Sequence, residues 1–442
     1  MQHRAAAVGV VGVVDQQLLP PATVGDDADL FPGLGVELVP DADARQGDLA
    51  DVGHLLCSSR PGAPIDVDVV NVVAGHGVPT ADRPEHAPRR CCPRPYDPNM
   101  TSSQSPTRPF PLEEVRALPK AELHVHLEGT VDPATLLDLA ARHGAEPPAD
   151  TVEGVQDWYR FDGFPMFLER YFAVLELLRD PEDFATIAER YLDTAHAQGV
   201  VHVELHVSAT GHIAEGGKAW APIHDGIVEG CQRAADRTGI SWGLIPDMSP
   251  HLGAAVCADA MEEVFAHDLT HLLAVGMGGP TDTWRTDDFS PIFRRAESLG
   301  IPAVSHAAEH GSAWEIRHAV EQFGARRIQH GIGVMADPDV VALLVERGIP
   351  CDVAPGSNLA LHAVDSPEAH PLRRMLDAGI AVTLGSDDPP LFQTTLLEEY
   401  QRAWEWCDLD MDGMAALARS SIEHSLASDA DKSTWLGGLA GA

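Results

Sequence analysis

Residues 301–355 read IPAVSHAAEHGSAWEIRHAVEQFGARRIQHGIGVMADPDVVALLVERGIPCDVAP, in which short apolar runs alternate with longer segments of helical period. The pattern predicts three strands and two helices, in the order strand 301–306, helix 312–323, strand 326–331, helix 338–347 and strand 349–355. Gly348 ends the second helix directly before the next strand, where glycine adopts the left-handed conformation at low cost. Strands that alternate with helices form a parallel sheet covered by helices.

The same alternation runs through residues 119–428 and predicts eight strands in all. The other five strands are expected at 121–126, 200–207, 240–248, 271–277 and 380–388, with further helices at 252–267 and 370–378. Eight repeats of this kind predict an α/β fold, a (β/α)8 TIM barrel. The first crossover, 132–198, is longer than a barrel needs and contains an aromatic-rich helical segment at 159–178. We expect this helical insertion to cap the barrel mouth, with an outer helix layer as the alternative.

The first 99 residues differ in composition from the rest of the chain. They contain no lysine and only Phe31 and Tyr96 as aromatic residues, which is poor material for a core. We interpret residues 1–99 as a low-complexity extension, either a disordered arm or an overlong start assignment with Met100 as the true first residue. The remaining divisions are a linker at 100–118, the barrel at 119–428 and a C-terminal tail at 429–442.

The overall composition excludes several classes of partner. Against 30 Lys and Arg stand 67 Asp and Glu, and the resulting net charge of −37 repels nucleic-acid phosphates and anionic membranes. The seven cysteines include no CxxC pair, which argues against a disulfide framework and against a thiolate zinc site. Every apolar run falls well short of the ~20 residues that span a bilayer. The composition predicts a cytoplasmic protein that binds neither nucleic acid nor membrane.

Histidines alternate on the first two expected strands. His124 and His126 lie two residues apart on the first one. Their backbone positions are therefore about 6–7 Å apart and their side chains leave the same face, within reach of one metal ion. His202 and His206 flank Glu204 on the second strand. They join no larger group in the sequence, so we interpret both as packing residues.

Polar residues also stand at the ends of later strands, where the active sites of such barrels lie. His306 ends the fifth strand, His330 the sixth and Asp387 the eighth. Three histidines and a carboxylate form a set that Zn²⁺ accepts with one position open for water, and the pKa of such a water falls to about 7. The lysines that could bridge two ions all lie away from the fourth strand's end, at Lys120, Lys218 and Lys432. The sequence thus predicts one Zn²⁺ per chain.

Five motifs carry a resemblance to a known family. They are PKAELHVHLEG at 119–129, SHAAEHG at 305–311, QHG at 329–331, APGSNLAL at 354–361 and TLGSDDPPLF at 383–392. In order and spacing they resemble the adenosine deaminase family of metal-dependent hydrolases. The resemblance implies a zinc-containing barrel that replaces the 6-amino group of a purine with oxygen and releases ammonia.

The resemblance also implies a role for each matching residue. The metal ligands are His124, His126, His306 and Asp387. Glu309 donates a proton to purine N1, and His330 orients the metal hydroxide. Asp388 bonds N7, unless it merely caps the segment that follows it, and the backbone of Gly278, or alternatively of Gly279, approaches N3. An acid at N1 suits this chemistry because attack on C6 develops negative charge in the ring.

Departures from the family pattern leave the substrate open. Ala308 stands where the family usually has glycine, and Ala354 and Gln329 also replace usual residues, although none of the three bears the chemistry. Glu128 belongs to the substrate site, where it either reads a ribose or shapes the pocket floor. We expect conversion of adenosine to inosine in purine metabolism. The alternatives are deamination of adenine or of another N6-amino purine nucleoside, and a catalytically inactive barrel that binds nucleosides.

Overall fold

The computed structural model describes residues 36–38, 55–57, 108–279 and 288–439. The chain divides into two compact units, 1–98 and 99–442. In the first unit the described residues are β1 (Val36–Leu38) and β2 (Leu55–Cys57), which pair antiparallel. The rest of the predicted extension and residues 100–107 of the predicted linker lie outside the described residues.

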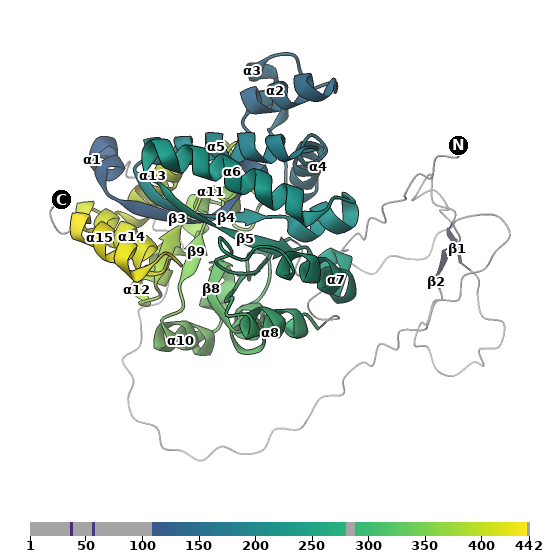
Figure 1. The fold of residues 1–442 in the computed structure, drawn as a ribbon. Helices are drawn as coiled ribbons and strands as arrows, with labels where there is room; N and C mark the ends of the chain where they lie inside the picture. Colours follow the sequence, from purple (N-terminus) through teal and green to yellow (C-terminus); the bar gives the residue numbers. More distant parts are fainter. Residues whose placement is uncertain (1–35, 39–54, 58–107, 280–287, 440–442) are drawn as a thin grey trace, which may run out of the picture. The chain divides into compact units, whose positions relative to one another are not determined.

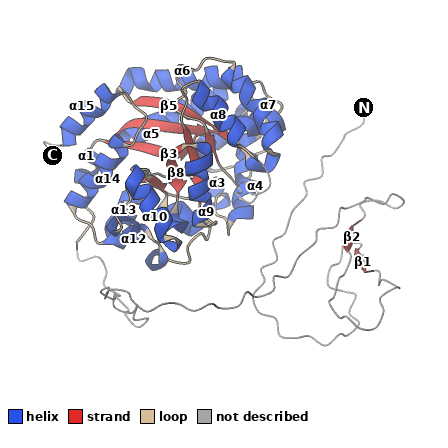
Figure 2. Ribbon diagram, turned by 90° about the horizontal axis from the view of Figure 1, so that it is seen from below, coloured by secondary structure: helices blue, strands red, loops and turns tan. Residues whose placement is uncertain are grey.

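Eight parallel strands form a closed barrel in the second unit. They are β3 (Lys120–His126), β4 (Val200–Val207), β5 (Ser241–Met248), β6 (Gly276–Met277), β7 (Ala303–Ala307), β8 (Ala325–His330), β9 (Cys351–Val353) and β10 (Val382–Leu384). Hydrogen bonds link them into two four-stranded sheets, β3-β4-β5-β6 and β7-β8-β9-β10. Single parallel bridges, Val125 to Asp387 and Val275 to Ala303, join the two sheets at both edges. The predicted (β/α)8 barrel is confirmed, and Figure 2 shows its strands within a ring of helices.

Helices follow the strands along the chain (Figure 1). Those up to β7 are α1 (Leu112–Ala117), α2 (Pro133–His143), α3 (Val152–Trp158), α4 (Phe164–Leu175), α5 (Pro181–Ala197), α6 (Trp220–Thr238), α7 (Ala254–Phe265) and α8 (Ser290–Ser298). The later ones are α9 (Ala313–His318), α10 (Pro338–Arg347), α11 (Pro355–Ala360), α12 (Leu372–Asp377), α13 (Leu396–Cys407), α14 (Met411–Glu423) and α15 (Asp429–Leu439). The segment expected as a C-terminal tail therefore forms a helix. Among the described residues no helix has the length and apolar character to cross a membrane.

Capping residues and glycines mark where several of these helices begin and end. Asp132 and Asp337 each cap a helix by accepting a backbone N–H, at the starts of α2 and α10. Gly300, Gly348 and Gly379 have φ values of 80°, 62° and 81° between a helix and the next strand. Glycine is the residue that adopts this left-handed conformation with the least strain, so the chain can leave each helix and enter a strand within a few residues.

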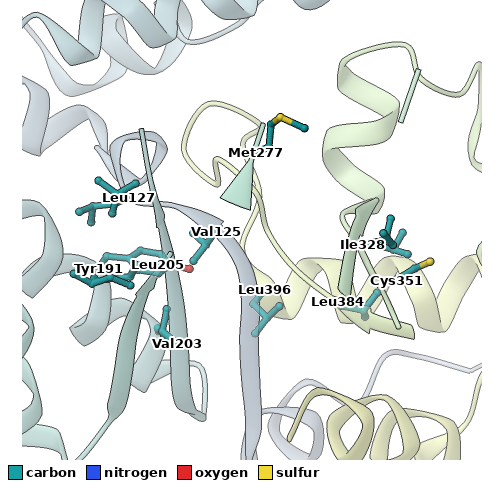
Figure 3. Packing of buried hydrophobic residues seen from close by; sticks show 14 of the residues in the cluster. Val125, Leu127, Tyr191, Val203, Leu205, Met277, Ile328, Cys351, Leu384 and Leu396 are labelled. Atoms are coloured by element: carbon teal, nitrogen blue, oxygen red, sulfur yellow. The ribbon is translucent and has the colours of Figure 1, made fainter. Parts of the chain in front are cut away.

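Apolar side chains on the outer faces of the strands pack against the helices. Leu205 of β4 and Tyr191 of α5 belong to one continuous core, which also includes Ile328 and Leu384 from the second sheet. Figure 3 shows part of this cluster, with Leu396 of α13 beside the strands. The barrel wall is therefore held from outside by apolar burial, while its inner face carries polar residues and a small apolar cluster of Ile245, Ala274 and Val304.

The interior of the barrel below the strand ends is filled by a buried charge cluster. Arg327 of β8 pairs with Glu204 of β4 at 2.6 Å and with Asp352 of β9 at 2.8 Å. All three side chains are buried. Because side chains two residues apart on a strand share a face, Glu204 and Arg327 lie one layer beneath His206 and Gln329. The cluster forms a solid floor under the carboxyl ends of the strands.

Candidate metal centre and active site

The four predicted metal ligands come together at the carboxyl end of the barrel. His124 and His126 lie on β3, His306 on β7, and Asp387 follows β10. The His306 Nε2 atom lies 3.2 Å from the Nε2 atoms of both His124 and His126. Asp387 Oδ1 lies 3.4 Å from His126 Nε2 and 3.6 Å from His124 Nε2. Zinc bonds of 2.0–2.1 Å in tetrahedral geometry place ligand atoms about 3.3 Å apart, so these separations suit one ion.

The protonation of the ligand imidazoles also fits a cation. The Nδ1 atom of His124 donates to the Asp352 carbonyl, and that of His306 donates to the Met277 carbonyl, each at 3.0 Å. Their Nε2 atoms therefore present lone pairs to each other at 3.2 Å, an arrangement that repels unless a cation lies between them. Burial, followed by the charge of His206, lowers the pKa of His124 to about 3, which keeps the ring neutral and able to bind a metal.

Backbone strain is concentrated at this site. Asp387, His330 and Ala308 have φ values of 64°, 57° and 53°. Non-glycine residues in this left-handed region cost of order 1–3 kcal/mol each and cluster at functional sites. The value at Ala308 also explains why a related sequence would prefer glycine at this position.

His330 lies beside the ligand cluster in a fixed orientation. Its Nδ1 accepts a hydrogen bond from Asn358 Nδ2 at 2.9 Å, so its Nε2 carries the proton. That Nε2 lies 3.8 Å from Asp387 Oδ2 and 3.7 Å from Glu309 Oε1. The Asn358 carbonyl oxygen in turn accepts from His370 Nε2 at 3.2 Å. Asn358 and His370 were missed from sequence, although Asn358 stands in the APGSNLAL motif.

Two carboxyl groups next to the cluster have oxygens without a protein partner. Glu309 Oε1 and Asp388 Oδ1 are both buried and accept no hydrogen bond from any described residue. Burial, followed by the charge of Asp387, raises the pKa of Asp388 well above its usual value; burial likewise raises the pKa of Glu309. A Cβ on Gly129 would lie 1.7 Å from Asp388 Oδ1, so this glycine makes room for the carboxyl. Both acids are therefore placed to hold a proton and donate it to a ligand.

Glu128 lies under the helical insertion and is already engaged by the protein. Its Oε1 accepts from the Ser208 backbone N–H and from His212 Nε2, both at 2.9 Å. Its Oε2 accepts from the Tyr171 hydroxyl at 3.4 Å. Of the two roles considered for Glu128, these contacts favour shaping the pocket floor over reading a ribose.

The predicted amide of Gly278 is occupied. Its N–H donates to the Met248 carbonyl at 3.1 Å, which extends the pairing of β6 with β5. The Gly278 amide is therefore engaged within the sheet. Gly279, the alternative, has a φ of 95°, and a Cβ on it would meet no other described atom within 4 Å. The role of either glycine at purine N3 stays a proposal.

His206 corrects another expectation from sequence. His202 packs as expected, with its ring stacked on Trp435 of α15. His206 does not merely pack: its ring centroid lies 5.2 Å from that of His126, and its Nδ1 bonds Asp247 at 3.0 Å. Asp247 lies in β5 and was not singled out, since its importance depends on strands β3 to β5 lying side by side.

Helix α4 covers the carboxyl ends of the strands. Phe167 stacks on Phe392, which follows β10, with ring centroids 5.1 Å apart. Tyr171 bonds Ser208, which follows β4, at 2.9 Å. Contacts with residues after two different strands favour the predicted cap over an outer helix layer.

Comparisons with known proteins agree with this geometry. Residues 119–440 match the family profile described as adenosine deaminase. An aminodeoxyfutalosine deaminase of Acidothermus cellulolyticus is 37% identical over 65% of this chain and 82% of its own length. The crystal structure of an adenine deaminase from Arthrobacter aurescens is similar with a TM-score of 0.69 and 31% identity, over 74% of this chain and 99% of that one.

A metal ion is present in another similar structure. A Burkholderia ambifaria amidohydrolase, solved with bound Zn, matches with a TM-score of 0.67 and 26% identity, over 74% of this chain and 91% of that one. The barrel, the cluster of three histidines and an aspartate, and the match over residues 119–440 lead to one conclusion. The chain belongs to the adenosine deaminase family of hydrolytic enzymes that act on C–N bonds.

Proposed function

We propose that this protein hydrolyses the 6-amino group of a purine and releases ammonia. The observation that carries the proposal is the pair of buried carboxyl oxygens without a hydrogen-bond partner, on Glu309 and Asp388, beside the ligand cluster. A buried polar atom without a partner is costly, so the site calls for a ligand with two hydrogen-bond acceptors. Purine N1 and N7 are two such acceptors on either side of C6.

The proposed roles follow from the positions of the side chains. His124, His126, His306 and Asp387 would hold a zinc ion, which would supply Lewis-acid activation of water at neutral pH. Glu309 transfers its proton to N1 as oxygen attacks C6, so the ring nitrogen does not accumulate negative charge. The His330 Nε2–H, fixed by Asn358, stabilises the attacking oxygen. Asp388 donates to N7 and holds the ring in position.

We favour adenine as the purine. Glu128 accepts three hydrogen bonds from the protein, and aromatic rings of Phe167 and Phe392 lie over the neighbouring strand end. Ribose hydroxyls buried against such a surface would lack partners, which costs a substrate about 1–3 kcal/mol for each unmet group. The adenine deaminase of Arthrobacter aurescens supports this choice. Adenosine, expected from sequence, is the second candidate because the matching family profile carries that description.

A substrate panel tests the proposal. We expect ammonia release from adenine, with a kcat/KM at least tenfold above that for adenosine, 2′-deoxyadenosine and 5′-extended adenosines. Glu309→Gln in the same assay reports the background rate. If kcat/KM is higher for a nucleoside than for adenine, the nucleoside replaces adenine as the proposed substrate. If zinc-loaded protein releases ammonia from no member of the panel, purine deamination is overturned.

A further inference from the structure

A row of residues crosses the inner face of four neighbouring strands. His126 of β3 is in register with His206 of β4, and Asp247 of β5 is in register with Gly276 of β6. The histidine rings and the Asp247 side chain are largely or fully buried. The row ends at a proposed metal ligand, His126, and its other members have no part in the proposed reaction.

Asp247 lies between the two imidazoles. Its carboxylate oxygens accept from His206 Nδ1 at 3.0 and 3.1 Å. Its Oδ2 also lies 3.5 Å from His126 Nδ1, the ring nitrogen that faces away from the ligand cluster. The other side of His206 is held by the Gln329 side chain, whose Nε2 lies 3.4 Å from His206 Nε2.

Gly276 makes this position of Asp247 possible. A Cβ on Gly276 would lie 1.8 Å from Asp247 Oδ1. Its backbone has no left-handed φ, in contrast to many glycines of the chain. Glycine weakens a strand, so its presence here indicates a close approach by another group rather than an unusual conformation. The space that a side chain from β6 would take is filled by the carboxylate from β5.

The Nδ1 atom of His126 faces a carboxylate, whereas the Nδ1 atoms of the other two histidine ligands face carbonyl groups. The Nδ1 atoms of His124 and His306 donate to backbone carbonyls. A carboxylate at this nitrogen fixes the ring orientation and increases the electron density that the other nitrogen offers a metal. Such a partner therefore strengthens metal binding more than a neutral carbonyl does.

We infer that Asp247, held by His206 and accommodated by Gly276, is a positioning residue that orients His126 for metal binding. The inference rests on the metal centre of the proposed function, and it concerns metal affinity rather than the choice of purine. His126, His206 and Asp247 also have the composition of a second metal site. His126 would then bridge two cations through both ring nitrogens and lose its last proton, so the positioning role is the simpler arrangement.

Competition with a chromophoric chelator tests this inference on the full chain. We expect Asp247→Asn to weaken zinc binding 10–100-fold, the range found when such partners of metal-bound histidines are removed. Deaminase activity at saturating zinc should stay within a few-fold of the wild type. The matched control is Asp193→Asn: Asp193 accepts a hydrogen bond from Arg237 at 2.6 Å and belongs to none of the groups of described residues that could hold a metal ion. Its zinc affinity should not change.

Moving the carboxylate from position 247 to position 276 tests whether zinc affinity can be restored. In the double variant Asp247→Ala/Gly276→Asp, the new aspartate grows from the position whose Cβ points at the vacated space. We expect it to recover most of the lost affinity. Gly276→Asp alone places two carboxylates in one space, and we expect its zinc affinity to fall.

The outcomes separate the positioning role from its competitors. Unchanged zinc affinity in folded Asp247→Asn would overturn it, and so would two zinc ions per wild-type chain by metal analysis. If Asp247→Asn does not fold, as judged by circular dichroism, His206→Gln carries the test with an expected loss of several-fold, and unchanged affinity there is equally decisive. A protein that binds zinc as expected but deaminates no purine would contradict the proposed function and leave this inference standing.

Discussion

The roles proposed for Glu309 and for the metal ligands can be tested separately, because the first concerns proton transfer and the second concerns metal binding. Glu309→Gln keeps the size and the hydrogen-bonding groups of the side chain but has no acidic proton to give. We expect it to retain zinc and to lose turnover by about 10²–10⁴-fold, the usual contribution of a positioned acid. Zinc content by mass spectrometry and ammonia release measure the two properties separately. Normal turnover in this variant would contradict the assigned role.

Removing a ligand should have a different effect. His306→Ala and Asp387→Ala each take away one of four groups whose atoms lie 3.2–3.6 Å apart. We expect both variants to lose metal and activity together, in contrast to Glu309→Gln. Full zinc content in either variant would show that the ligand set is assigned incorrectly.

Ala308 stores strain that glycine would relieve. Its φ of 53° lies in the left-handed region, which costs a residue with a Cβ about 1–2 kcal/mol. We expect Ala308→Gly to raise the free energy of unfolding by about 0.5–1 kcal/mol after the entropy of the unfolded chain is subtracted. Ala307→Gly, in the regular part of β7, is the control and should destabilise the protein. Denaturant titration measures both.

At the scale of secondary-structure elements, substitutions in helix α4 can test whether this helix caps the barrel. Phe167 is buried against Phe392, whereas Phe172 on the same helix is 42% exposed. We expect Phe167→Ala to raise KM about tenfold by loosening the cover over the substrate, given the 0.5–1.5 kcal/mol of a ring pair beyond its buried area. Phe172→Ala should leave KM unchanged. Equal effects from the two variants would argue against the cap.

The elements also show which parts of the fold and site follow from sequence. All eight strands lie where apolar runs predicted them, and the ligand residues follow from motifs with fixed spacing. The expected strand at 271–277 has a ladder only at Gly276 and Met277, because Leu272 and Val275 make isolated bridges. The Gly278 amide and the Asp247 carboxylate take their roles from a neighbouring strand. Register between strands is a property of the closed barrel that local pattern does not contain.

At the scale of the whole molecule, the buried charge cluster of Arg327, Glu204 and Asp352 predicts how the stability of the protein depends on pH and on substitution. Burial favours the neutral acid, but Arg327 and His202 outweigh it and lower the pKa of Glu204 to about 2. Because the unfolded value is about 4.3, the stability from this acid is complete above that pH and is lost as pH falls toward 2. Replacing its partner should therefore matter most near neutral pH.

Arg327→Met tests this response. The variant leaves Glu204 and Asp352 without their cation, and we expect the free energy of unfolding to fall by about 3–5 kcal/mol at pH 7. The deficit should shrink toward pH 4, where the carboxyl groups take up protons. Arg295→Met is the matched control, since Arg295 pairs with Glu262 at the surface and such pairs contribute about 0–1 kcal/mol. Denaturant titrations at both pH values provide the measurement.

The way in which the barrel closes predicts that the metal centre contributes to the thermal stability of the whole barrel. Among the described residues, backbone pairing joins the two four-stranded sheets at an isolated bridge on each edge, Val125 with Asp387 and Val275 with Ala303, and the Arg327–Glu204 ion pair also crosses between them. His124 and His126 belong to one sheet, while His306 and Asp387 belong to the other or follow its last strand. An ion bound by all four side chains would therefore connect one half of the barrel to the other. Calorimetry should record a single transition for the zinc-loaded protein and a transition at lower temperature after chelation, because the ion binds the folded barrel and stabilises it relative to the unfolded chain.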